Sequence, residues 1–106
     1  MAWIYLLLAA LFEIGWAIGL KLSDGLTRPR IALATVAAMV ISIVLLAVAQ
    51  RSLPIGTAYA VWTGIGACGT AILGMILFGE PHDAARLLCL ALIVGGIVGL
   101  KVLSPI

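Results

Sequence analysis

Residues 2–20 read AWIYLLLAALFEIGWAIGL, an apolar run that contains a single charged residue, Glu13. About 20 mostly apolar residues are enough to cross the hydrocarbon core of a bilayer as a helix. Of the 106 residues in the chain, 65% are hydrophobic and only 9% are charged, whereas about a quarter of a soluble domain is charged. The composition therefore predicts an integral membrane protein. The run has no basic segment before it and carries a carboxylate, so we expect a retained span rather than a signal peptide.

Charged and turn-forming residues divide the rest of the chain into three further apolar runs. All backbone groups in lipid need partners within their own segment, so each run is expected to be a helix. The fold class predicted is an all-α membrane protein with four transmembrane helices, in a single domain of residues 1–106. The predicted helices are about residues 2–21, 31–50, 57–79 and 84–103.

The basic side chains lie on both sides of the predicted bundle. Four of them, Lys21, Arg28, Arg30 and Arg86, belong to the side of the first and third loops, and Arg51 and Lys101 belong to the other. This positive-inside bias is weak, which would permit insertion in both orientations and makes an antiparallel homodimer possible.

Several other classes of partner receive no support from the sequence. The net charge of +2 and the lack of a basic stripe argue against nucleic acid. Cys68 and Cys89 lie in apolar runs without a CxxC motif, so neither a metal site nor a disulfide is expected. Nothing in the sequence indicates a cofactor.

Glu13 lies roughly 16–18 Å into the first predicted helix, close to the middle of the bilayer. A charge at that depth costs several kcal/mol unless it is paired or hydrated, and no basic residue lies in the core of any span. Glu13 is therefore either protonated or faces an aqueous cavity, where it meets a cation. The alternative is a structural role, in which a neutral carboxyl group hydrogen-bonds to a neighbouring helix.

The residues predicted to surround Glu13 suit a flat cation. Helical spacing places Ala10 and Trp16 one turn to either side of Glu13. The third span offers Tyr59 and Trp62 on one face, and the second offers Ser42, a hydroxyl that could orient the carboxylate. A carboxylate pairs with a planar guanidinium through two N–H bonds, and aromatic faces attract the same cation. The alternatives are interfacial aromatic residues and a serine bonded within its own helix.

Glycines in the third and fourth spans suggest movement and association. Gly64 and Gly66 make a bend easier near the predicted site, so they are candidates for a hinge. In the fourth span, Cys89 and Gly96 share a face with a ridge of small residues, which permits close helix packing in lipid. We expect this ridge to form the dimer interface; the alternative is packing within one protomer.

Four segments of the chain carry a specific resemblance to a known family: Trp3–Lys21, Leu53–Gly66, Gly79–Pro81 and Gly99–Lys101. Over essentially its whole length the chain resembles the small multidrug resistance transporters. The resemblance implies a proton-coupled antiporter, an antiparallel homodimer of dual topology in a bacterial inner membrane. It implies that Glu13 binds substrate and protons in a site lined by Trp16, Ser42, Tyr59 and Trp62.

Within the family, three features resemble the guanidinium-exporter subtype: Trp16, Ser42 and the Gly-Leu-Lys ending at Lys101. Ala10 departs from the pattern, since similar exporters usually carry glycine there. The function predicted is export of guanidinium and small guanidinyl cations by alternating access, with protons and substrate competing for Glu13, and not an enzymatic activity. The alternatives are an exporter of quaternary ammonium cations, a small membrane scaffold subunit and a passive channel.

Overall fold

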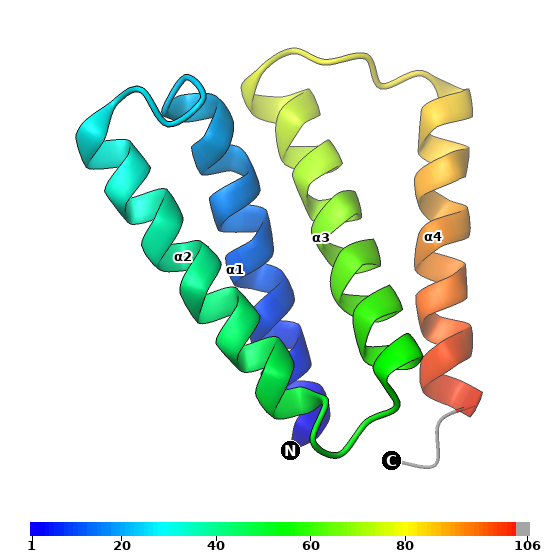
Figure 1. Cartoon of the computed structure of the whole chain (residues 1–106). Helices are drawn as coiled ribbons and strands as arrows, with labels where there is room; N and C mark the ends of the chain where they lie inside the picture. Colours follow the sequence, from blue (N-terminus) through cyan, green and yellow to red (C-terminus); the bar gives the residue numbers. More distant parts are fainter. Residues whose placement is uncertain (104–106) are drawn as a thin grey trace.

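The computed structural model describes residues 1–103 and contains four α-helices in sequence (Figure 1). Their bounds are Ala2–Leu22 (α1), Pro29–Ala49 (α2), Ile55–Leu77 (α3) and Ala84–Leu103 (α4). With 20 to 23 residues each, they are about 30–35 Å long, the thickness of a hydrocarbon core. All four are long and apolar enough to cross a membrane, which confirms the predicted fold class. Residues 104–106 of the predicted domain lie outside the described residues.

The ends of two helices differ from the prediction by two residues. Helix α2 begins at Pro29 rather than at residue 31, because the first turn of a helix needs no amide donor and tolerates proline. Helix α3 begins at Ile55, directly after Pro54, and ends at Leu77 rather than at residue 79. Gly79 takes a positive φ of 65° just beyond it, a conformation that interrupts the helix.

Helices α1 and α2 form an antiparallel hairpin around a tight loop (Figure 1). Three consecutive residues, Asp24, Gly25 and Leu26, take left-handed backbone conformations there. The buried Ser23 hydroxyl holds the turn, accepting from the amide of Leu26 at 3.0 Å and donating to the carbonyl of Leu20 at 3.2 Å. The loop thus keeps the two helices in contact without a longer connection.

The core lies where α1, α2 and α3 meet, and it consists of small and aliphatic side chains. Leu6, Ala9, Ala49, Ala58 and Val61 are all fully buried there. Helix α4 packs along α3 at the outer edge of the bundle and has no buried residue (Figure 1). The chain is flat, 43 × 34 × 16 Å along its principal axes, so most of its apolar surface is left for lipid or another protein chain to cover.

Candidate functional site

Glu13 lies on the face of α1 that packs against α3, and its carboxylate rests on the backbone at Gly66. A side-chain carbon added at Gly66 would overlap both carboxylate oxygens and the carbon between them. The glycine therefore makes room for the acid. Carboxylate oxygen Oε2 is buried and has no hydrogen-bond partner among residues 1–103. Within residues 1–103, a carboxylate oxygen near the middle of α1 is therefore buried without a donor.

Ser42 links three helices through two hydrogen bonds. Its hydroxyl donates to the carbonyl of Ala9 on α1 at 2.6 Å and accepts from the indole N–H of Trp62 on α3 at 3.0 Å. The alternative of a bond within its own helix is therefore not what the structure shows. The hydroxyl does not orient the carboxylate directly either, because its only proton is given to Ala9. In an α-helix that carbonyl also accepts the amide of Glu13, four residues on, so Ser42 braces the turn that carries the acid.

The predicted aromatic residues differ in their surroundings. Trp62 is anchored by Ser42 and packs against the core, and its ring centroid lies 5.7 Å from that of Tyr59. Tyr59 itself is 56% exposed on the surface of the single chain. The indole nitrogen of Trp16 is buried and has no hydrogen-bond partner in the described part of the chain. The Trp62 indole is thus held by a hydrogen bond, whereas the Trp16 indole N–H makes none within the described residues.

Ala10 is completely buried, as is its neighbour Ala9. Both are small residues that allow α1 to pack closely within the bundle. The extra methyl group at Ala10 is therefore accommodated without exposure in this conformation.

Replacing Ser42 with alanine should loosen the contact between the three helices. The Ser42→Ala variant loses two hydrogen bonds and leaves the N–H of the half-buried Trp62 without its acceptor, which should cost about 1–3 kcal/mol. Thermal unfolding of the purified protein in detergent would show a lower midpoint. Ser52→Ala, in the exposed α2–α3 connection, is the matched control and should unfold like the parent. Equal midpoints for all three proteins would contradict the bracing role.

The two glycines predicted as a hinge both lie where another element approaches α3 closely. A side-chain carbon at Gly64 would lie 2.8 Å from Ile97 and 3.3 Å from Ile93 of α4, and Gly66 faces Glu13. Helix α3 is continuous through both positions. In this conformation the glycines therefore serve close approach, and bending at them stays a prediction.

The face of α4 predicted to associate is open in the single chain. Cys89 is exposed, and side-chain carbons added at Gly95, Gly96 or Gly99 would meet nothing within 4 Å. The glycine ridge is thus not used for packing within the described part of the protomer. By contrast, Cys68 on α3 is buried, with its sulfur 3.7 Å from the carbonyl of Leu90.

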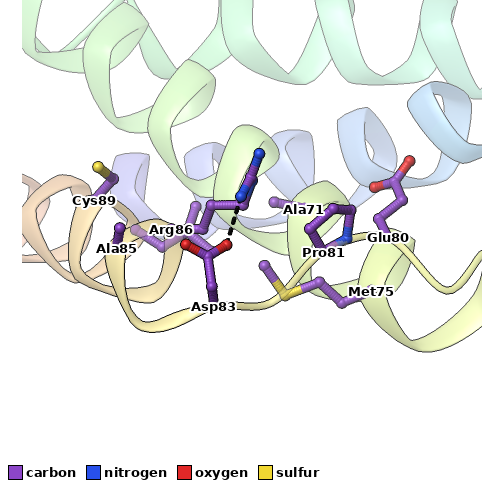
Figure 2. A pocket seen from close by; sticks show the side chains of 9 residues that line it. Ala71, Met75, Glu80, Pro81, Asp83, Ala85, Arg86 and Cys89 are labelled. Carbon is purple, nitrogen blue, oxygen red and sulfur yellow. Dashed lines mark hydrogen bonds and ion pairs between the residues drawn. The ribbon is translucent and has the colours of Figure 1, made fainter.

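A cavity of about 690 Å³ lies at the loop end of α3 and α4, away from Glu13 (Figure 2). Its lining includes Met75, Cys89 and Glu80, together with the ion pair between Asp83 and Arg86. The hydrogen bond from Arg86 lowers the pKa of the Asp83 carboxyl group. Because this carboxylate is exposed and already paired, it is a weaker candidate for binding a cation than Glu13.

Sequence patterns did not single out Thr70 in α3 or Phe78 directly after that helix. The ammonium group of Lys21 lies 5.2 Å from the ring centre of Phe78, at the same end of both helices. The hydroxyl of Thr70, one turn after Gly66, is buried with no hydrogen-bond partner among the described residues. Helical spacing from Gly66 places Thr70 on the face of α3 that meets α1, but only once the pairing of these two helices is known.

Comparison with known proteins places the chain in a family. The profile of the Small Multidrug Resistance protein family matches residues 1–93. The chain is 59% identical to the guanidinium exporter of Citrobacter freundii over 101 residues, which cover 95% of this chain and 96% of that protein. It is also 59% identical to the guanidinium exporter of Yersinia pseudotuberculosis over 104 residues, covering 98% of this chain and 100% of that protein.

These relatives are bacterial exporters, and they match the chain over nearly the whole of its four membrane-spanning helices. The chain is accordingly a multi-pass protein of the bacterial inner membrane. The family resemblance inferred from the Trp3–Lys21 and Leu53–Gly66 segments is confirmed by these matches. The protein belongs to the small multidrug resistance family of membrane transporters.

Proposed function

We propose that this protein exports guanidinium and small guanidinyl cations in exchange for protons, and that both ligands bind at Glu13. The observation that carries the proposal is the Glu13 carboxylate, which is held against Gly66 with one oxygen buried and unpartnered within residues 1–103. The relatives named as guanidinium exporters support this choice of cargo.

The chemistry of the surrounding groups favours a planar cation with N–H donors. An ionised carboxylate only accepts hydrogen bonds, and a guanidinium presents two parallel N–H groups along each edge. The Trp62 ring, fixed by its bond to Ser42 and tilted by 48° to the neighbouring Tyr59 ring, supplies an aromatic surface on α3. Such a surface attracts a flat cation through the quadrupole of the ring.

Antiport follows if the proton and the guanidinium cation compete for the single carboxylate of Glu13. An uncompensated carboxylate in mid-membrane is costly, so it binds either a proton or the cation. When cargo leaves, a proton replaces it, and the protein changes conformation with the acid neutral or paired. Inward movement of protons thus drives outward movement of guanidinium. In this proposal Gly64 and Gly66 allow α3 to bend as the site opens to alternate sides.

The working unit in this proposal is an antiparallel homodimer. A single flat chain leaves α4 without buried residues and its glycine ridge uncovered, and small residues allow close helix association in lipid. Cys89 and Gly96 lie on that surface. The weak asymmetry of basic residues permits both orientations, and the second chain would complete the walls around the two Glu13 carboxylates.

The direct test is a cargo panel on purified protein in liposomes. Guanidinium should evoke transport currents that depend on the proton gradient, whereas a tetraalkylammonium ion, which has no N–H donor, should evoke far smaller ones. Larger currents with the tetraalkylammonium ion would identify a quaternary ammonium exporter instead. Guanidinium flux that is not exchanged for protons would indicate a channel, and no cation-dependent flux at all would indicate a scaffold.

A further inference from the structure

Three polar side-chain atoms are buried without a hydrogen-bond partner among residues 1–103: Glu13 Oε2, Trp16 Nε1 and Thr70 Oγ1. Buried polar atoms are usually paired, so each exception calls for an explanation. All three belong to α1 and α3, which pack against each other. Guanidinium export as proposed above involves Glu13 and assigns no role to the hydroxyl of Thr70.

The packing of the two helices places these atoms along one seam. Glu13 meets Gly66, and Ile14 meets Gly69. Further on, Lys21 lies over the Phe78 ring, so the two helices run in the same direction. Trp16 follows Glu13 by three residues and Thr70 follows Gly66 by four, which is one helical turn in each case. Both residues therefore stand one turn beyond the contact between the acid and the glycine.

The hydroxyl of Thr70 differs from that of another buried threonine in the chain. A helical threonine normally satisfies its hydroxyl by donating to the carbonyl four residues earlier. Thr35 does so, with its oxygen 2.8 Å from the carbonyl of Ile31. The hydroxyl of Thr70 makes no such bond among the described residues. The donor and acceptor capacity of this hydroxyl is therefore unused within the described part of the chain.

Only two of the three groups, the Glu13 carboxylate and the Thr70 hydroxyl, can accept hydrogen bonds from a guanidinium ion. The Trp16 N–H only donates, so it cannot bind the cation's N–H groups. Glu13 accepts along one edge of the guanidinium, which leaves donors on the other edges unpaired. We propose that the Thr70 oxygen accepts one of these remaining N–H groups and is a second cargo-binding residue beside Glu13. This inference rests on the proposed export of guanidinyl cations.

The test is equilibrium binding of guanidinium to the purified protein, followed by tryptophan fluorescence at several pH values. Thr70→Val removes the hydroxyl and keeps the shape, and it should weaken guanidinium binding about tenfold, as expected for a lost hydrogen bond to a charged group. Thr70→Ser should restore most of the affinity. The affinity of Glu13 for protons, obtained from the pH dependence of guanidinium binding, should not change in Thr70→Val. The reason is that the hydroxyl is proposed to bind the cargo and not the carboxylate.

Thr35→Val is the matched control, since it removes a buried threonine hydroxyl that bonds within its own helix; it should bind like the parent. If Thr70→Val does not give a monodisperse protein, Thr70→Ala provides the same comparison without added bulk. Parent-like affinity in the hydroxyl-free variant overturns the Thr70 assignment while leaving guanidinium export intact. Equal weakening of cargo and proton binding also overturns it, in favour of a packing role. A parent protein that does not bind guanidinium overturns both proposals.

Discussion

Glu13→Gln should abolish guanidinium-evoked transport in proteoliposomes. The amide keeps the size of the side chain but removes the negative charge, and with it the charge-assisted pairing and the exchangeable proton. Loss of one partner from a desolvated ion pair costs about 3–5 kcal/mol, so apparent affinity should fall by at least about a hundredfold. Currents recorded on solid-supported membranes measure this directly.

Glu80→Gln is the matched control for this substitution. It makes the same chemical change at an exposed residue outside the helices, and we expect currents like those of the parent. Both variants should insert and purify similarly, since neither side chain is required to fill the core. Guanidinium-evoked, proton-dependent currents that persist in Glu13→Gln would rule out the carboxylate as the shared site.

Gly66→Ala should also disable transport, because it displaces the Glu13 carboxylate without removing its charge. The added methyl group would overlap the Glu13 carboxylate, so either the acid must rotate away or α1 and α3 must separate. Overpacking of this kind costs about 1–3 kcal/mol, and displacement of the acid should weaken guanidinium binding by about tenfold or more. The loss cannot come from helix propensity, because alanine favours a helix over glycine by about 1 kcal/mol.

Gly15→Ala is the control that separates displacement of the acid from the effect of a glycine-to-alanine change on helix stability. It makes the same change in α1, where an added carbon meets nothing within 4 Å. We expect unchanged binding and equal or higher thermal stability for this control. Parent-like guanidinium binding by Gly66→Ala would mean that the contact between Glu13 and Gly66 is not part of the working site.

Much of the fold was predictable because a lipid bilayer allows few kinds of secondary structure to span it. Runs of about 20 apolar residues must become helices in a bilayer, so the four spans follow from the charges that separate them. Their ends were less predictable. The second helix was predicted from about residue 31, yet α2 begins at Pro29, because a proline in the first turn lacks an amide that the helix does not need.

The candidate site shows where sequence patterns reach their limit. Helical spacing groups Ala10 and Trp16 with Glu13, since these neighbours lie on one helix. It cannot say which face of α3 or α2 meets that helix. The bond from Ser42 to Ala9 and the contact between Glu13 and Gly66 depend on how the helices pack. Thr70 could not be identified from the sequence either. A threonine in a helix ordinarily bonds to its own backbone, so its residue type gives no sign of a free hydroxyl.

The most direct test of the central claim is the pH dependence of guanidinium binding to the parent protein. If cargo and proton exclude each other at Glu13, the apparent dissociation constant should be independent of pH in alkaline solution and should rise as the pH falls. At the acid end the rise should approach about tenfold per pH unit for each proton displaced per cation. An affinity that stays constant from alkaline to acid pH would show that the two ligands do not share the carboxylate, and would contradict the mechanism.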